Sequence, residues 1–170
     1  MNENSQDRAE NPTDAIRFSS SAELCKISVE MIGLAKRHVD IVSRSLEPTV
    51  YDTLECFEAL KQLAIARRGR IRIIILDPDS VISRGSSRLV QLAMRLSSFI
   101  EIRRPGEDHL AFNEAMLIVD RKGIVHRKYA DRYEGIANAY APRQAAQLTE
   151  CFESMWQNAE TIPYFRRLML

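Results

Sequence analysis

Two of the three histidines stand in segments where an imidazole group could take part in catalysis. His126 is followed two positions later by Lys128, and on a strand both side chains would lie on the same face. His109 lies in a loop segment just ahead of an apolar run. An imidazole can act as nucleophile or general acid, and a nearby ammonium group can hold negative charge that builds up during hydrolysis. The simpler interpretation is an exposed basic strand for His126 and an exposed loop residue for His109.

Residue types that bind metals occur in patterns with ordinary structural explanations. Asp77 and Asp79 flank a proline directly after an apolar run, and Asp-Pro after a strand is a turn signal. The three cysteines are far apart, odd in number and without a CxxC pair, at Cys25, Cys56 and Cys151. We interpret them as buried reduced thiols, and we expect neither a metal nor a cofactor.

Basic residues gather locally although the whole chain is nearly neutral, with 24 Lys and Arg against 23 Asp and Glu. The overall charge therefore does not favour DNA, RNA or an anionic membrane as a partner. The local clusters are Arg67, Arg68, Arg70 and Arg72, then Arg84, Arg88 and Arg95, with Lys122, Arg127 and Lys128 as further contributors. The second cluster would form a stripe along one helix, either as an anion-binding surface or, as we favour, as a solvated face. No aromatic residues interleave with the arginines, so nucleic-acid binding is the weaker alternative.

Strand and helix patterns alternate along the chain and predict the elements that would position these residues. Strands are predicted at 16–18, 39–45, 71–78, 99–103, 114–120, 124–129 and 133–139. Helices are predicted at 24–35 with a cap at Ser20 or Ser21, and at 53–68, 83–98 and 142–159. This order predicts an α/β domain with a mixed, largely parallel sheet flanked by helices.

A length of 170 residues fits one domain with little room for a second. We predict a disordered tail at 1–14, the domain at 15–162 and a C-terminal tail at 163–170. The first residues lack the apolar segment of a signal peptide, and no stretch reaches the ~20 apolar residues that span a bilayer. We therefore expect a soluble protein of the cytoplasm.

Three segments in order resemble the phospholipase D superfamily, specifically its single-half members of the bacterial type. The first is a helix-to-strand passage from Leu34 to Leu46, and the second is a helix, Arg-Gly turn and strand from Ala59 to Asp77. The third runs from Glu114 to Trp156 and includes a signature strand, a hairpin, a strand carrying Glu134 and a closing helix. The resemblance covers residues 16 to about 159 and implies a phospholipase D-like sandwich.

Active members of that superfamily carry His-x-Lys-x4-Asp, in which histidine forms a covalent intermediate and lysine stabilises phosphoryl charge. When Asp120 is matched to the motif's aspartate, Asn113 stands at the histidine and Ala115 at the lysine. The family's Gly-Ser-x-Asn stretch would fall near residues 127–130, which read Arg-Lys-Tyr-Ala. We expect this degenerate site to lack phosphodiesterase chemistry, and we expect Asp120 to have a structural role at the strand end.

The resemblance leaves two hypotheses from different classes. The first is a pseudoenzyme that serves as a binding, assembly or regulatory module, as a homodimer. Its remaining cleft would hold a phosphate-bearing ligand at Asn113, Asp120, Lys128 and Glu134. The alternative is an active phosphodiesterase or nuclease that uses a rearranged histidine, either His126 with Lys128 or His109.

Overall fold

The described strands form one mixed sheet in the computed structural model, which describes residues 14–85 and 87–167. The sheet has eight strands in the order β1-β7-β6-β5-β2-β3-β4-β8 among these residues. The strands are β1 (Ile16–Phe18), β2 (His38–Ser43), β3 (Arg70–Ile75), β4 (Ile100–Arg104), β5 (Ala115–Val119), β6 (Gly123–Arg127), β7 (Gly135–Asn138) and β8 (Glu160–Thr161). The helices are α1 (Ser21–Leu34), α2 (Pro48–Tyr51), α3 (Leu54–Ile65), α4 (Pro78–Arg84), α5 (Arg88–Arg95), α6 (Pro142–Asn158) and α7 (Pro163–Arg167), and a short 3-10 turn, η2, spans Glu107–His109.

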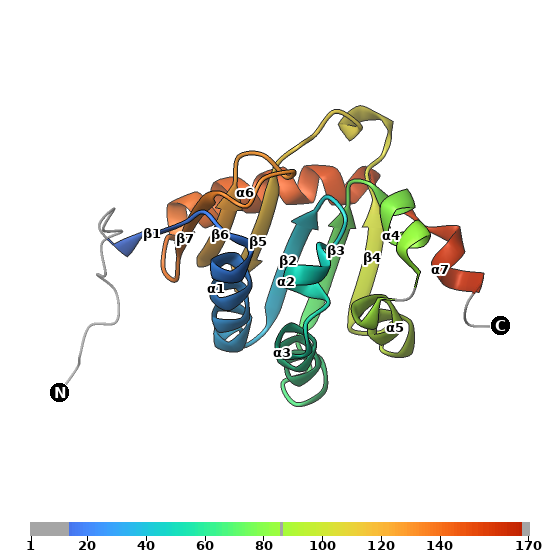
Figure 1. Ribbon diagram of the computed structural model, residues 1–170, viewed down its shortest axis with the longest axis horizontal. Helices are drawn as coiled ribbons and strands as arrows, with labels where there is room; N and C mark the ends of the chain where they lie inside the picture. The colour runs from blue at the N-terminus through green and yellow to red at the C-terminus, as the bar shows by residue number, and fades with distance from the viewer. Residues whose placement is uncertain (1–13, 86, 168–170) are drawn as a thin grey trace.

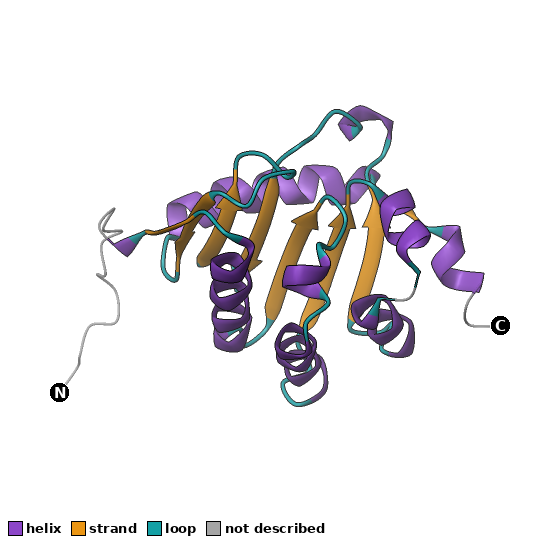
Figure 2. Cartoon of the chain, viewed as in Figure 1, coloured by secondary structure: helices purple, strands orange, loops and turns teal. Residues whose placement is uncertain are grey.

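The predicted α/β class and the mixed sheet are confirmed. The sheet is not largely parallel, however, because among the described strands only the pairs β2–β3 and β3–β4 are parallel and the other five pairs are antiparallel. The helices α1, α3 and α5 precede these three strands and cover one face, whereas α6 crosses the opposite face (Figure 1). Figure 2 shows the same two helical layers with the sheet between them. Right-handed crossovers place successive helices on one side of a parallel sheet, which explains this arrangement. The result is a sandwich that buries both sheet faces.

Alternate residues of the central strands supply the two cores. Ile41, Ile73 and Leu117 point towards the helices α1, α3 and α5 and belong to the larger core. Val42 and Ile74 point the other way and pack beneath α6, where Phe152 and Trp156 stack with ring centres 5.6 Å apart. Because strand side chains alternate between faces, a near-continuous apolar run serves both cores.

A charged cluster lies under α6 on this second face. The guanidinium of Arg72 is 2.8 Å from Asp40 and 2.6 Å from Glu153, and it stacks 4.8 Å from the Phe152 ring centre. Burial raises the pKa of Asp40, whereas the Arg72 hydrogen bond lowers the pKa of Glu153. Burial would lower the pKa of Arg72, but hydrogen bonds to both carboxylates outweigh it. Arg72 is therefore half-buried and paired, and its assignment to a basic surface cluster is wrong.

The single helix predicted at 83–98 is also wrong, because the chain breaks there into α4 and α5. Asp77 caps α4 by accepting from the backbone N–H of Ser80, and Gly85 ends it with φ 94°. A left-handed φ of this kind favours glycine and ends the helix. Arg84 donates to the backbone carbonyls of Ser45 and Leu46, so the predicted arginine stripe is interrupted at its first member.

Several other predicted boundaries agree with the structure, and one segment differs. Ser20 caps α1 by accepting from the Glu23 N–H at 3.1 Å, and Pro142 begins α6. Within the predicted C-terminal tail, residues 163–167 form α7, and Phe165 packs into the larger core. The predicted N-terminal tail lies outside the described residues except for Asp14.

The cysteines are free thiols. Only Cys56 is fully buried, and burial raises the pKa of its thiol to about 12, while Cys25 and Cys151 are half-buried.

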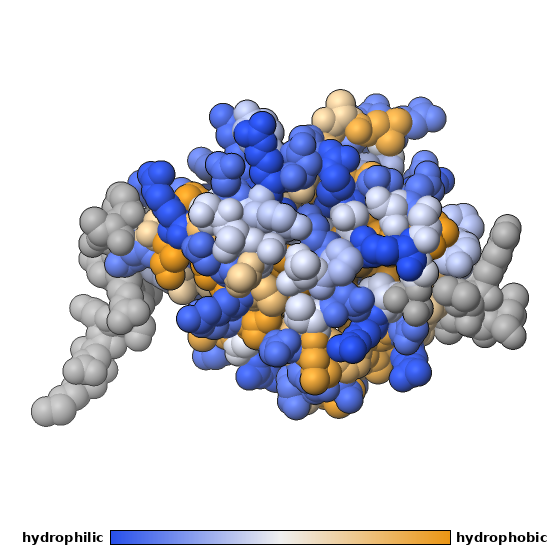
Figure 3. All heavy atoms as spheres, in the orientation of Figure 1, coloured by the Kyte–Doolittle hydropathy of each residue, from blue (hydrophilic) through white to orange (hydrophobic). Residues whose placement is uncertain are grey.

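No helix in the described part of the chain is long and apolar enough to cross a membrane. Figure 3 shows hydrophilic side chains over much of the face that carries α1 and α3, with hydrophobic ones gathered at the lower end of α3.

Candidate functional site

One end of the sheet gathers most of the residues that the sequence singles out. β5 runs antiparallel to both β2 and β6, so the start of β5 lies beside the ends of the other two strands. In this register Ala115 is opposite Arg127, and Met116 is opposite both Val42 and His126. Asn113, which precedes β5, and Lys128, which follows β6, therefore extend from the same end of the sheet.

Asn113 and Ala115 are the residues that stand at the motif's histidine and lysine when Asp120 is matched to its aspartate. The side-chain oxygen of Asn113 accepts a hydrogen bond from Arg44, and its backbone carbonyl accepts from the Ala130 N–H at 2.8 Å. Ala115 is buried and has no polar group in its side chain. The two positions supply neither a nucleophile nor a cation, since their polar atoms serve the surrounding structure.

A buried network that the sequence analysis missed lies next to these positions. Arg127 is 3% exposed and donates to Glu47 at 3.1 Å and to the Arg132 carbonyl at 2.9 Å. The other Glu47 oxygen accepts from Ser43 Oγ at 2.8 Å, and Ser43 Oγ accepts from the Leu46 N–H at 3.0 Å. A buried charge requires such partners to offset its lost hydration.

Strand alternation contained a signal for this network. If His126 and Lys128 share one face of β6, then Arg127 must point to the other face, together with Val125 of the larger core. A buried arginine implies a buried acid, but the partner, Glu47, lies 80 residues earlier in the chain. No local pattern identifies a partner at that separation.

His126 faces the opposite side of the sheet from Arg127. Its Nε2 lies 2.8 Å from a Glu114 carboxylate oxygen, and the two side chains are 26% and 43% exposed. A carboxylate at this distance from a ring nitrogen orients the imidazole ring. The pair is thus accessible to solvent and polar, unlike the buried Arg127–Glu47 pair.

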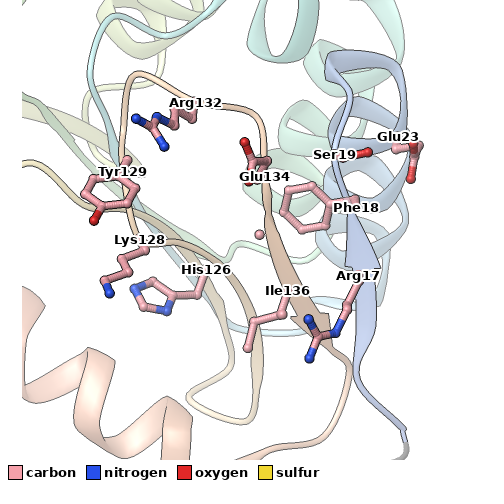
Figure 4. A pocket seen from close by; sticks show the side chains of 11 residues that line it. Arg17, Phe18, Ser19, Glu23, His126, Lys128, Tyr129, Arg132, Glu134 and Ile136 are labelled. Carbon is pink, nitrogen blue, oxygen red and sulfur yellow. The ribbon is translucent and has the colours of Figure 1, made fainter.

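A cavity of about 510 Å³ opens beside the end of β6. Three sequence-predicted residues line it, namely His126, Lys128 and Glu134. Figure 4 shows His126 and Lys128 on one side of the cavity, with Glu134 and Phe18 across from them. The remaining lining residues are Arg17, Ser19, Glu23, Tyr129, Arg132, Gly135 and Ile136. The cavity therefore lies between the β6–β7 loop and the segment that joins β1 to α1.

Three cations face this cavity without a salt bridge to any described carboxylate, namely Arg17, Lys128 and Arg132. Arg132 instead stacks on the Tyr129 ring, 4.9 Å from its centre. Unpaired guanidinium and ammonium groups bind phosphate oxygens through charge-assisted hydrogen bonds. Carboxylates from Glu23 and Glu134 line the same cavity and can accept hydrogen bonds from hydroxyl or amino groups.

Asp120 lies at the far end of β5 from Asn113, so the structure separates these two predicted ligand-binding residues. Its carboxylate accepts from the backbone N–H groups of Lys36, Arg37 and His38 at 2.8–2.9 Å. Burial acts to raise the pKa of Asp120, but these hydrogen bonds outweigh it and lower the pKa. Asp120 joins the β5–β6 turn to the start of β2.

His109 ends the 3-10 turn η2 between β4 and β5 and does not line the cavity. Its Nδ1 is buried without a hydrogen-bond partner in the described part of the chain. Among the described residues, no group of three or more His, Cys, Asp and Glu side chains is arranged to hold a metal ion. The two candidate histidines are thus in different settings, and only His126 faces the cavity.

Solved structures with the same fold include two proteins of nearly the same length. Nuc from Salmonella typhimurium, a phospholipase D family member, has a TM-score of 0.62 and 17% identity, covering 87% of this chain and 97% of Nuc. NucT from Helicobacter pylori has a TM-score of 0.63 and 15% identity, covering 87% of this chain and 98% of NucT. The predicted phospholipase D-like fold is therefore confirmed.

TrmBL2, an archaeal chromatin protein with a novel mode of DNA binding, has a TM-score of 0.64 and 17% identity. The match covers 91% of this chain and 56% of TrmBL2, so this chain spans a little over half of that protein. No curated protein is significantly similar in sequence to this chain. A family model matches residues 20–168, and the chain belongs to the family described as Domain of unknown function (DUF7931).

Proposed function

We propose that this protein is a non-catalytic phospholipase D-like domain that binds a phosphate-bearing ligand. The observation that carries the proposal is the structure around Asn113 and Ala115, which stand at the histidine and lysine of the superfamily motif. Asn113 accepts from Arg44, Ala115 has no polar side chain, and the adjacent Arg127 is bonded to Glu47. Loss of one charge-stabilising donor alone typically lowers a rate ~10²–10³-fold.

The cavity next to these positions supports the binding part of the proposal. Arg17, Lys128 and Arg132 supply positive charge, and Glu134 supplies an acceptor for a hydroxyl or amino group. A volume of about 510 Å³ falls within the range that small-molecule sites occupy. The ligand class that fits is a small phosphorylated compound with polar groups on its non-phosphate part.

Calorimetric titration with inorganic phosphate and with phenyl phosphate tests binding. We expect phenyl phosphate to bind more tightly, because Phe18 and Tyr129 can contact its ring. Lys128→Ala should raise the dissociation constant about 10-fold or more through loss of a charge-assisted hydrogen bond. Arg88→Ala is the matched control, since this exposed arginine on α5 does not line the cavity. Equal affinity of the two variants would contradict the assigned site.

Hydrolysis of a chromogenic phosphodiester, with and without a chelator, tests the non-catalytic part. We expect the same background rate from the wild type, His126→Ala and His109→Ala. A phosphodiesterase is the second candidate function, because His126 faces the cavity with a carboxylate 2.8 Å from its ring nitrogen. Turnover that His126→Ala abolishes would establish this alternative and overturn the non-catalytic proposal.

A further inference from the structure

Three segments bring positive charge to the end of the sheet opposite the cavity. They are the α1–β2 linker, the α3–β3 linker with the first residue of β3, and the β5–β6 turn. We call this surface the cationic end, and its members are Lys36, Arg37, Arg67, Arg68, Arg70, Arg121 and Lys122. Their positions in the sequence do not group all seven, because the three segments are far apart along the chain.

Hydrogen bonds hold the three segments together. His38 is opposite Arg70 in the parallel β2–β3 register, and the Arg70 N–H donates to the Arg37 carbonyl at 2.8 Å. Asp120 of the β5–β6 turn accepts from three successive N–H groups that begin with Lys36. The cationic end is therefore a single surface with a defined shape.

The cations of this surface are exposed, and the charge of Arg121 acts on the carboxylate of Glu153, which Arg72 contacts. All seven side chains are solvent-exposed, and none forms a salt bridge with a described carboxylate. Asp120 is the one carboxylate within the three segments, and its oxygens are occupied by backbone N–H groups. A surface with one sign of charge produces a positive potential that attracts anions from solution.

Two exposed aliphatic side chains lie at the same end. Leu34 is the last residue of α1 and is 59% exposed, and Ile65 is the last residue of α3 and is 52% exposed. Arg67 ties the two helix ends together by donating to the carbonyls of Gly33 at 3.1 Å and Ala35 at 2.6 Å. Figure 3 shows hydrophobic side chains reaching the surface at the lower end of α3.

We propose that the cationic end docks on the surface of an anionic lipid bilayer. Lys and Arg side chains would bind headgroup phosphates, while Leu34 and Ile65 would enter the boundary between headgroups and acyl chains. Basic residues around exposed aliphatic ones are typical of peripheral membrane binding. Nucleic acid fits less well, since the three segments contain no aromatic residue for base stacking and no projecting helix for a groove.

This inference is independent of the proposed function, because the cavity lies at the other end of the sheet. A bilayer contacting the α1–β2 and α3–β3 linkers does not reach the β6–β7 loop and its cavity. Failure of ligand binding in the cavity would therefore say nothing about lipid binding, and the reverse also holds.

Vesicle co-sedimentation tests the proposal with the full chain. We expect binding to vesicles of equimolar phosphatidylcholine and phosphatidylglycerol, and none to vesicles of phosphatidylcholine alone. Binding should weaken steeply with added salt, since exposed charges are screened over about 10 Å at 0.1 M salt. The triple substitution Arg37→Glu, Arg70→Glu and Lys122→Glu should lower the partition coefficient ~100-fold or more.

Matched variants distinguish the contribution of the apolar side chains to lipid binding from that of the cations, and they show whether reversal of any three charges has the same effect. Leu34→Ser with Ile65→Ser should lower lipid binding about 10-fold without changing its salt dependence. Arg17→Glu, Lys128→Glu and Arg132→Glu reverse the same number of charges at the cavity and should leave lipid binding unchanged. Circular dichroism confirms that each variant is folded before it is compared.

Three results would overturn the proposal. The first is equal binding to neutral and anionic vesicles, and the second is equal lipid binding by the cationic-end and cavity triple variants. The third is binding of duplex DNA, abolished by the cationic-end variant, with no binding to anionic vesicles. That last outcome would assign the same surface to nucleic acid through phosphate contacts.

Discussion

At the scale of single residues, two Arg–Glu ion pairs with the same distance of 3.1 Å between nitrogen and oxygen should contribute differently to stability. Arg127 and Glu47 are both buried and share a network with Ser43, so neither charge can regain water if its partner is removed. Arg104 and Glu160 form an exposed pair with side chains 45% and 53% accessible. Burial, rather than the distance between the atoms, decides how much each pair matters to stability.

We predict that Arg127→Met lowers the free energy of unfolding by ~3–5 kcal/mol, because it leaves the Glu47 charge buried without a cation. Arg104→Met is the control and should cost less than about 1 kcal/mol. Urea titration followed by circular dichroism measures both values. Similar losses for the two variants would contradict the buried role of Arg127.

The contribution of Asp120 to the stability of the protein should depend on pH. Its pKa is lowered in the folded protein, so its contribution is present above the ordinary pKa of aspartate and is lost as pH falls through the folded value. Asp120→Asn keeps a residue type that tolerates the positive φ of 51° but removes the charge. We predict a loss of about 1–2 kcal/mol at pH 7 and a smaller loss near pH 3. Urea titrations at the two pH values measure this, and an equal loss at both would contradict it.

At the scale of elements, substitution of the glycine in α1 and of the glycine that follows α4 should have opposite effects on stability. Gly33 lies in the last turn of α1, and Gly85 ends α4 with φ 94°. A methyl group at either position would meet no other atom within 4 Å. Backbone conformation alone therefore decides the effect of substitution, since space does not differ between the two sites.

We predict that Gly85→Ala lowers the free energy of unfolding by about 1 kcal/mol or more, because an L side chain strains a left-handed backbone. Gly33→Ala should instead raise it by ~0.5–1 kcal/mol by reducing the entropy of the unfolded chain and adding helix propensity. Thermal melting distinguishes the two signs. If both substitutions stabilise the protein, the break between α4 and α5 is not held by the Gly85 conformation.

At the scale of the whole molecule, the two ends of the sheet present different surfaces. The end with the cavity also exposes apolar groups on the loops around Asn113, including Leu110 at 73%, Tyr129 at 45% and Tyr133 at 38%. Exposed aromatic and aliphatic side chains around a polar site are typical of surfaces that associate with another protein. The opposite end combines cations with Leu34 and Ile65 and fits a lipid surface instead.

We propose that the cavity end carries a homodimer contact, as the resemblance to single-half phospholipase D enzymes implies. Light scattering should then give about twice the 19.5 kDa of one chain. Tyr133→Asp with Leu110→Asp should convert the dimer to a monomer, because charges in an apolar contact remain without partners. The control is Leu54→Asp, another exposed aliphatic position that lies at the start of α3. A monomeric wild type at all concentrations would contradict the proposal.

The sequence predicted an element well where its apolar pattern is continuous and where a residue such as proline marks its boundary. The Ile and Leu run of β3 and the proline that begins α6 are of this kind. It failed at 83–98, because the helical spacing of Leu89, Leu92 and Leu96 continues backwards through Gly85 without a visible interruption. The chain breaks there because Gly85 ends α4 with a positive φ of 94°, which periodicity alone does not reveal.

What the sequence by itself determined is local: the order of strands β1 to β7 with helices α1, α3 and α6, and the absence of histidine at 113 and lysine at 115. Only the tertiary structure decided the neighbours of each residue. It paired Arg127 with Glu47, separated Asp120 from Asn113, and gathered seven cations from three distant segments. The physical reason is that strand pairing brings together residues far apart in the chain, and a local pattern contains no information on that pairing.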